Sequence, residues 1–370
     1  MTAQIPEKKA IRLHLTNVAG LGAVQLLQSL LPCFEQLPAY QVAEMYLPTR
    51  GELAHYQTAD SRTALHYYTR YLPNALSRLL ECTLFAGQFN GDIPLLVLGD
   101  IPLKCTAKQT VFVQTTLLTH GANANSLLDA PKYWIARWLF RFNINYVANF
   151  IVQTETMKTA LTASYPSIAG RVHVITPPVP NWLLESQLKR TQRNVRADTG
   201  LRLFYPAAGY PHKNHQLLTA IHSEDAYAWS VAELLLTIPE NAHPNSVIPW
   251  IHCVDRLMPD AVITAYSNAD ALLFLSLSES FGFPLVEAMW IGLPIICPNL
   301  PYAHALCGEQ AIYFNPDDVQ SLFMAVLELN SRLASDWWPD WSENLTVIPQ
   351  HWHDVAETML SLATSEGETK

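Results

Sequence analysis

Apolar segments in the first half of the chain alternate with amphipathic ones, and glycines or polar residues separate them. Residues 11–15 predict a strand, and a glycine-containing turn over residues 17–22 separates it from an apolar helix over residues 23–31. Alternating strands and helices favour a mainly parallel sheet that helices cover on both faces. The same pattern predicts further helices at about residues 64–85 and 132–142, and further strands at residues 94–98, 110–114, 149–153 and 172–175.

Residues 176–182 interrupt this pattern, because three of four successive positions there are proline. Neither a helix interior nor a central strand accommodates such a run. A polar, charged segment over residues 185–199 follows, and a second α/β pattern begins after it. We therefore predict an α/β chain with two doubly wound, Rossmann-like domains, residues 1–182 and residues 183–350. The strands predicted for the second domain are residues 201–205, 250–254, 271–277, 294–297 and 311–314.

Residue types that favour helix ends mark two helices of the second domain. Pro284 suits a first turn, and Gly292 suits the end of the same helix. Further along, Asn315 is expected to cap a helix whose first turn contains Pro316, with Asp317 favouring its positive end.

Composition narrows the class of protein. With 49% hydrophobic and 15% charged residues, the 370-residue chain can bury large cores, which excludes general disorder. The net charge of −9 argues against a general nucleic-acid binder. The charge is uneven, since residues 1–182 sum to +4 and residues 183–370 to −13. No window reaches the ~18 uninterrupted apolar residues of a membrane span, and six scattered cysteines without Cys-x-x-Cys spacing indicate a cytoplasmic protein.

Two glutamates flank the predicted start of the helix at Pro284. Glu279 lies on the loop where the preceding strand ends, and Glu287 lies one turn into the helix. Ligands of open α/β sheets bind at this carboxyl edge, and the first helical turn offers N–H groups to an anion. Gly282 permits close approach of the backbone. Two carboxylates beside an anion site fit a ligand that also carries hydroxyls, such as a nucleotide sugar. The alternative is that Glu287 only complements the helix dipole.

Lys213 follows the first strand of the second domain, so it is expected at the same carboxyl edge. A cation there can hold a diphosphate and stabilise its charge as it leaves. His212 and His215 are close enough in sequence to suggest a metal site, but no acidic third ligand is nearby. We therefore favour turn and capping roles for both histidines and expect no metal.

The turn at Gly20 and Gly22 fits only part of a dinucleotide-binding fingerprint, because Gln25 occupies the third glycine position. The turn is either a tight strand-to-helix connection or a close approach to the phosphate or sugar of a ligand. The incomplete fingerprint makes a redox Rossmann enzyme the weaker alternative.

These motifs together resemble the retaining glycosyltransferases of family four, which have the GT-B fold. The segment Glu-Ser-Phe-Gly-Phe-Pro-Leu-Val-Glu-Ala (residues 279–288) is typical of that family. So are Pro-His-Lys-Asn-His (residues 211–215) and Gly-Leu-Pro-Ile-Ile (residues 292–296). The resemblance covers residues 201–330 most clearly and is weaker over residues 1–182.

The family implies two domains that face each other across a cleft, the first binding the acceptor and the second the nucleotide sugar. Residues 351–370 would form a last helix that packs back on the first domain. The reaction would move a hexose from a nucleoside-diphosphate sugar to an acceptor hydroxyl with retention, without a metal or another cofactor. The acceptor would be a saccharide or lipid-linked saccharide of bacterial surface polysaccharide or lipopolysaccharide.

The resemblance also implies roles for single residues. Glu279 would contact the hydroxyls of the donor sugar, Glu287 the ribose, and Lys213 the diphosphate. The turn containing Gly20 and Gly22 would close over the donor from the first domain. Backbone contacts to sugar and phosphate would come from Gly282, Phe283, Pro284 and Leu285.

The chain departs from the family at two positions. Many relatives have an arginine where Ala208 stands, and Arg256 is a candidate substitute. Many also have a histidine where Gln114 stands, with His120 a less favoured equivalent. Gln114 can hydrogen-bond a hydroxyl but cannot act as a base. These departures leave open a non-catalytic nucleotide-sugar-binding protein. A nucleotide-sugar epimerase of GT-B fold is a further alternative.

Trp134, Arg137, Trp138 and Arg141 recur at helical spacing. Tryptophan and arginine together suit a membrane interface, so a membrane surface is a further partner to consider, at the inner face of the membrane. The alternative, which we favour from the sequence, is an amphipathic helix whose tryptophans pack into the core.

Overall fold

The computed structural model describes residues 8–18, 20–72, 74–119, 130–191 and 200–365. The chain divides into two compact units, and its last part belongs to the first of them. Unit 1 comprises residues 1–178 and 349–370, and unit 2 comprises residues 179–348. The boundary predicted at 182/183 therefore lies inside helix α5 (Asn181–Ser186), just beyond the point where the units divide.

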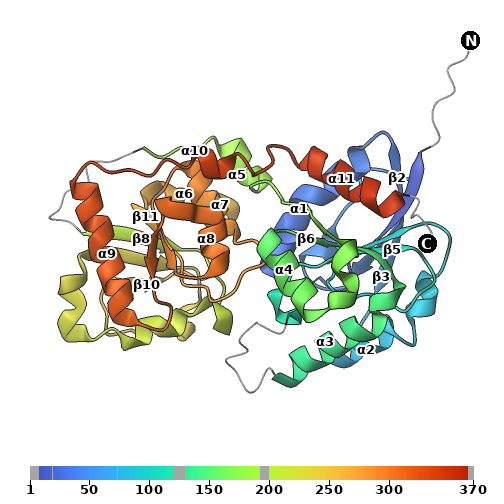
Figure 1. The fold of residues 1–370 in the computed structure, drawn as a ribbon, viewed down its shortest axis with the longest axis horizontal. Helices are drawn as coiled ribbons and strands as arrows, with labels where there is room; N and C mark the ends of the chain where they lie inside the picture. Colours follow the sequence, from blue (N-terminus) through green and yellow to red (C-terminus); the bar gives the residue numbers. More distant parts are fainter. Residues whose placement is uncertain (1–7, 19, 73, 120–129, 192–199, 366–370) are drawn as a thin grey trace, which may run out of the picture. The chain divides into compact units, whose positions relative to one another are not determined.

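Unit 1 is built on one parallel sheet, which within the described residues has the strand order β3-β2-β1-β4-β5-β6-β7 (Figure 1). The order reverses between β1 and β4, which is the pattern of a doubly wound fold. The strands predicted from the apolar pattern are confirmed, whereas β2 and β3 were not predicted. The strands are β1 (Lys9–His14), β2 (Tyr40–Pro48), β3 (Ala64–Tyr68), β4 (Leu95–Val97), β5 (Gln109–Phe112), β6 (Val147–Val152) and β7 (Val172–Val174).

The helix predicted over residues 64–85 is wrong in its first part. Residues 64–68 form β3, which pairs with β2 at the edge of the sheet, and helix α2 (Asn74–Cys82) begins only after it. The segment Ala-Leu-His-Tyr-Tyr contains aromatic residues that favour strands, and pairing with β2 outweighs the weak helical periodicity.

Helix α11 (Trp352–Thr364) packs on α1 (Leu21–Gln36) within unit 1 (Figure 1). Its buried residues recur at three- and four-residue steps, so one stripe of the helix faces the core. Helix α4 (Glu155–Ser164) shows a side-chain cap, since the Thr154 hydroxyl accepts a hydrogen bond from the N–H of Met157.

Helix α3 (Ala130–Asn143) does not bury its tryptophans, so the core-packing role favoured from the sequence is wrong. Trp134 is 66% exposed and Trp138 is 44% exposed. Leu139 and Phe140 face the core instead, with Ile135 packed against them. The two tryptophans flank this buried stripe and therefore remain at the surface.

Unit 2 is also built on a parallel sheet, whose order in the described residues is β10-β9-β8-β11-β12-β13. The chain runs outward from β8 to β10 and then returns to place β11 beside β8. The carboxyl ends of β8 and β11 therefore flank the point where the strand order reverses. The strands are β8 (Leu201–Tyr205), β9 (Val231–Leu236), β10 (Ile251–Cys253), β11 (Ala271–Leu273), β12 (Ile295–Pro298) and β13 (Ile312–Phe314).

Helix α7 (Phe283–Ile291) begins and ends where the sequence predicts. Gly282 precedes it with φ 87°, and Gly292 ends it with φ 84°. A Cβ at Gly292 would lie 2.8 Å from the carbonyl oxygen of Arg190, so glycine is required there for space as well as for conformation. The other helices of unit 2 are α6 (Pro259–Asn268), α8 (Pro301–Cys307), α9 (Val319–Ala334) and α10 (Ser342–Leu345).

The cap predicted at Asn315 is wrong by three residues. The Asp318 carboxylate accepts a hydrogen bond from the N–H of Gln320 and caps α9, which begins at Val319. Asn315 instead accepts from the N–H of Asp317 at 3.2 Å. Asparagine readily closes such a turn two residues ahead, and this turn delays the start of the helix.

Candidate functional site

Lys213 and Glu279 form an ion pair at the carboxyl edge of the unit 2 sheet. The two residues lie on the loops that follow β8 and β11, which are adjacent strands. Lys213 Nζ lies 2.5 Å from Glu279 Oε1, and the side chains are 15% and 13% exposed. The structure thus brings these two predicted site residues together at the point where the strand order reverses.

Backbone hydrogen bonds hold these two loops against each other. The N–H of Leu277 donates to the carbonyl of His212 at 2.7 Å. The Tyr205 hydroxyl donates to the carbonyl of Lys213, also at 2.7 Å, and anchors that loop to its own strand. Asn214 adopts a left-handed conformation and donates from Nδ2 to the carbonyl of Pro316. The charged pair is therefore supported by a framework of hydrogen bonds around both loops.

The two histidines beside Lys213 lie in short 3-10 turns, residues 211–213 and 215–220. Burial, together with the charge of Lys213, lowers the pKa of His215 to about 4. The same causes lower the pKa of His212. Their rings pack on Tyr205 and Tyr210. The turn placement agrees with the sequence prediction, but neither side chain caps a turn. Among the residues that the structure describes, no group of three metal-binding side chains occurs.

Glu287, on α7, is buried and accepts a hydrogen bond from a neighbouring helix. Its side chain is 4% exposed, and the Tyr266 hydroxyl of α6 donates to Glu287 Oε2 at 2.8 Å. Burial raises the pKa of Glu287 to about 7. Helix α7 is buried on nearly all sides, so a carboxylate in its middle needs a buried donor. Sequence patterns give no signal for Tyr266, whose role depends on how α6 packs.

The backbone before and within the first turn of α7 offers fewer free donors than predicted. Pro284 has no N–H, and the N–H of Leu285 donates to the carbonyl of Gly282 at 2.9 Å. The left-handed conformation of Gly282 closes this turn. Gly282 and Leu285 are buried, whereas Phe283 and Pro284 are half-buried. An anion at this helix end would therefore meet the backbone at Gly282 and Phe283.

The predicted residues of unit 1 lie at the carboxyl edge of its own sheet. Gly20 and Gly22 are exposed at the start of α1. Gln114 is half-buried, and one N–H of its side-chain amide donates to the carbonyl of Leu98 at 3.0 Å. His120 lies outside the described residues. In unit 2, Ala208 is half-buried and Arg256 lies on the exposed loop after β10.

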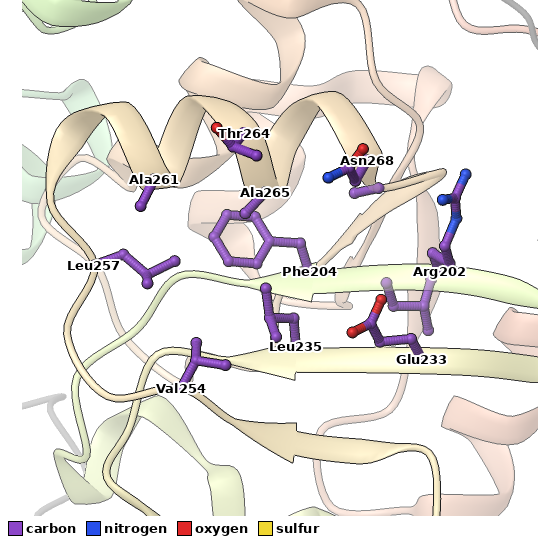
Figure 2. Close-up of a pocket in the computed structure, with 12 residues that line it drawn as sticks. Arg202, Phe204, Glu233, Leu235, Val254, Leu257, Ala261, Thr264, Ala265 and Asn268 are labelled. Carbon is purple, nitrogen blue, oxygen red and sulfur yellow. The ribbon is translucent and has the colours of Figure 1, made fainter.

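A pocket of about 220 Å³ lies between α6 and strands β8 and β9 (Figure 2). Phe204, Leu235 and Leu257 contribute apolar walls, and Arg202 and Glu233 lie at one end. None of the predicted site residues lines it. The candidate site is therefore the edge with Lys213 and Glu279, and this pocket is a separate feature of unit 2.

Residues 238–332 match the protein family described as "Glycosyl transferases group 1". The matched segment contains Glu279, Gly282 and Glu287. The chain therefore contains a group 1 glycosyltransferase domain. This domain starts after β9 and continues into α9, so Lys213 and all of unit 1 lie outside the match.

Relatives of known activity extend the likeness beyond this glycosyltransferase domain. The chain is 25% identical over 250 residues to the O-antigen chain mannosyltransferase RfbU of Salmonella typhimurium, covering 63% of this chain and 66% of that protein. It is 27% identical over 238 residues to the serotype-specific mannosyltransferase WbdA of Escherichia coli, covering 64% of this chain but 28% of that protein. The chain thus spans less than two thirds of these relatives.

The structural similarity to a solved protein extends over almost the whole chain. WaaG, a glycosyltransferase involved in lipopolysaccharide biosynthesis, superimposes with a TM-score of 0.63 at 15% sequence identity. The superposition covers 96% of this chain and 100% of WaaG. Two Rossmann-like units with parallel sheets, together with this neighbour, establish the GT-B fold.

Proposed function

We propose that this chain is a retaining, metal-independent glycosyltransferase of family four. It transfers mannose from a nucleoside-diphosphate sugar to a hydroxyl of a saccharide or lipid-linked saccharide, in the assembly of bacterial surface polysaccharide or lipopolysaccharide. The Lys213–Glu279 pair is the observation that carries this proposal, because it places one cation and one carboxylate where open α/β sheets bind ligands. The mannosyltransferase relatives support mannose as the sugar.

In this proposal the ammonium of Lys213 binds the diphosphate and stabilises the negative charge that develops as it leaves. Glu279 holds Lys213 through Oε1, which leaves Oε2 for a hydroxyl of the donor sugar. The acceptor oxygen bonds to the anomeric carbon on the face from which the phosphate departs. The departing phosphate oxygen takes the proton of the acceptor hydroxyl, so no protein base is needed and retention follows.

Glu287 serves the ribose of the donor in the same proposal. The Tyr266 hydroxyl already donates a hydrogen bond to Glu287 Oε2. A ribose hydroxyl would therefore donate to Oε1, at the small part of the side chain that is exposed. A buried carboxylate that keeps only one protein donor is costly unless a ligand supplies another.

The donor and the reaction can be tested together. We expect one nucleoside-diphosphate mannose, with GDP-mannose as the first probe, to raise the melting temperature and to be consumed only when a saccharide acceptor is present. NMR of the product should show the anomeric configuration of the donor, with equal rates in EDTA. An inverted linkage, or a rate abolished by EDTA, would contradict the proposal. Release of an epimerised sugar without an acceptor would support the epimerase. Binding of the nucleotide sugar without any turnover would support the non-catalytic protein.

A membrane surface is the second partner that we propose. The aromatic face of unit 1 comprises Trp134, Trp138 and Phe142 of α3, all of them exposed, with Trp138 stacked on Phe142 at 5.1 Å. Lys104 Nζ lies 5.5 Å from the centre of the Phe142 ring, and Arg141 is exposed on the same helix. No described helix is long and apolar enough to cross a bilayer.

Charge favours an anionic bilayer as the occupant of this face. The aromatic face carries basic side chains, and α3 has no acidic residue, although the chain as a whole has a net charge of −9. Aromatic residues with flanking cations bind the interface of membranes that contain anionic lipid. Arg137 does not take part, because its Nε donates to the carbonyl of Leu117. The proposed location is therefore cytoplasmic and peripheral, at the inner face of the membrane.

Vesicle sedimentation tests the aromatic face. We expect Trp134→Ala/Trp138→Ala to lower partitioning onto vesicles of anionic phospholipid by about tenfold, and Arg141→Glu to lower it by roughly fivefold at low salt. Tyr227→Ala, which removes a 90% exposed aromatic residue of unit 2, is the matched control. Equal partitioning of wild type and the tryptophan variant would contradict a role for the aromatic face.

A further inference from the structure

Asp100 lies at the carboxyl edge of the unit 1 sheet, in the loop that follows β4. Strand β4 is the neighbour of β1, and the strand order reverses between these two strands. Doubly wound sheets bind their ligands at such a reversal. Asp100 is half-buried, so part of it is accessible from solvent. The sequence motifs do not single it out, and the structure gives it a distinctive conformation.

The backbone at Asp100 adopts a turn that is rare for residues other than glycine. Its φ is 68°, and the N–H of Ile101 donates to the carbonyl of Gly99 at 2.8 Å, which closes a three-residue turn around Asp100. A γ-turn with a positive φ at its centre is strained, and such strain persists only where the surroundings enforce it. In the described part of unit 1, Asp100 is the only residue besides glycines with a positive φ.

Two contacts of the turn explain how it is held. A Cβ added to Gly99 would lie 2.6 Å from the Cβ of Asn17, so the loop after β4 packs directly on the loop after β1. On the other side, the Asp100 carboxylate accepts a hydrogen bond from the backbone N–H of Gln114 at 2.5 Å. Gln114 follows β5, which is the next strand of the sheet. The turn thus brings the carboxylate to the ends of β4 and β5.

The surrounding charges balance one another and leave Asp100 ionised at neutral pH. Burial raises its pKa to about 6, while the N–H of Gln114 and the charge of Arg78 act in the opposite direction. The largely buried Arg78 is attracted by both Asp100 and Glu81. Glu81 in turn accepts a hydrogen bond from Arg70 at 3.1 Å. Two arginines therefore face two carboxylates, and the cluster has no charge left for an ionic ligand.

The Asp100 carboxylate keeps capacity to accept a further hydrogen bond. Its Oδ1 accepts from Gln114, and the N–H of Thr115 also interacts with the carboxylate. An ionised carboxylate has about four lone-pair sites, so these two donors leave room for another. Gln114 and Thr115 are half-buried like Asp100, so neutral hydrogen-bonding groups border it. A neutral hydroxyl is the donor that suits this balanced, polar edge, and a carboxylate binds it strongly.

We propose that Asp100 binds a hydroxyl group of the acceptor saccharide. This inference rests on the proposed glycosyl transfer and assigns to its acceptor a specificity-determining residue in unit 1. The donor already has a cation and a carboxylate in unit 2, in Lys213 and Glu279. Phosphate groups, whether of the donor or of a lipid-linked acceptor, do not bind at Asp100, because a carboxylate repels them.

The variant Asp100→Asn removes the charge and keeps the turn. Asparagine tolerates a positive φ, and its side-chain oxygen can still accept from the N–H of Gln114. With methyl α-mannoside as the acceptor probe, which has no alkyl chain to bind the aromatic face, we expect kcat/KM for the acceptor to fall by about tenfold. The KM for GDP-mannose and the slow hydrolysis of GDP-mannose, in which water replaces the acceptor, should stay at wild-type values.

Asp92→Asn is the matched control for this charge removal. Asp92 is an exposed aspartate in the loop that precedes β4, at the opposite edge of the same sheet. We expect this variant to keep wild-type kinetics for both substrates. Equal values of kcat/KM for methyl α-mannoside in wild type and Asp100→Asn would overturn the inference.

Monodeoxy analogues of methyl α-mannoside show whether Asp100 contacts a hydroxyl. With wild type, one analogue should lose about tenfold in kcat/KM because it lacks the hydroxyl that Asp100 binds. With Asp100→Asn the same analogue should lose little more, since the contact is already absent. A structural role would not produce this coupling. Losses that are equal in wild type and variant for every analogue would contradict the contact.

The melting temperature and donor hydrolysis separate acceptor binding from a structural role. We expect Asp100→Asn to melt at or above the wild-type temperature at pH 8, because it removes a half-buried charge. A lower melting temperature together with equal losses of hydrolysis and transfer would show that Asp100 only supports the fold.

A binding measurement keeps this test independent of turnover. Saturation-transfer NMR on methyl α-mannoside should give a signal several-fold weaker with Asp100→Asn than with Asp92→Asn, and equal signals would overturn the inference. Absence of hydrolysis and transfer with every nucleotide sugar would instead contradict the proposed function, and the NMR comparison would still decide the role of Asp100.

Discussion

Lys213→Ala is expected to lower kcat for sugar transfer by on the order of 10²–10³, the loss typical of removing a preorganised donor to developing charge. The Lys213 side chain is 15% exposed, and a carboxylate and a hydrogen-bonded loop hold it in place. Water cannot fully replace such a group in a partly desolvated site. The measurement is initial-rate release of the nucleoside diphosphate at saturating donor and acceptor.

The controls for Lys213→Ala address folding and charge. Lys189→Ala removes an exposed lysine of unit 2 that contacts Trp290, and we expect it to keep wild-type kcat. The double variant Lys213→Ala/Glu279→Gln avoids an unpaired carboxylate, so it separates catalytic loss from strain in the folded state. A fall in kcat of less than tenfold, in variants that melt at the wild-type temperature, would remove Lys213 from the proposed mechanism.

The arrangement of Lys213 and Glu279 could be predicted in part from the sequence. Each residue follows an apolar run that predicts a strand, and carboxyl ends of parallel strands share one edge. The sequence does not show that β8 and β11 are neighbours, because this pairing joins strands about 70 residues apart through a crossover. The resemblance to a glycosyltransferase family supplied that adjacency, and the ion pair at 2.5 Å is consistent with it.

Other features depend on packing that periodicity does not encode. Whether Trp134 is buried depends on which stripe of α3 meets the sheet, and Ile135 lies only one position away. Glu287 accepts a hydrogen bond from the hydroxyl of Tyr266, which lies on α6, the helix that precedes β11. Arg78 belongs to no motif, and only its burial and its unpartnered Nε distinguish it from a surface arginine. Tertiary contacts of this kind decide side-chain environment after the strands and helices are fixed.

Glu287→Gln is expected to stabilise the unliganded protein at pH 8 and to leave its stability nearly unchanged at pH 4.5. Burial raises the pKa of Glu287 from its ordinary 4.5 to about 7, so the folded state resists ionisation of this carboxyl. Below pH 4.5 the group is protonated whether the chain is folded or unfolded, and it contributes no penalty. Between pH 4.5 and pH 7 the carboxyl ionises in the unfolded chain but not in the folded one, so the penalty grows over this range, and above pH 7 the full cost is on the order of 3 kcal/mol.

Melting curves of wild type and Glu287→Gln between pH 4.5 and pH 8 measure this difference, in which the titration of all other groups cancels. Glu185→Gln, at an exposed glutamate of unit 2, should show no such trend. A difference that stays constant with pH would show that Glu287 has an ordinary pKa.

The ionisation of Glu287 should also affect ligand binding, since a carboxylate accepts a hydrogen bond from a ribose hydroxyl better than a carboxylic acid does. Affinity for a nucleoside diphosphate should therefore increase as the pH rises through 7 in wild type. In Glu287→Gln it should be weaker by about tenfold at pH 8 and independent of this ionisation.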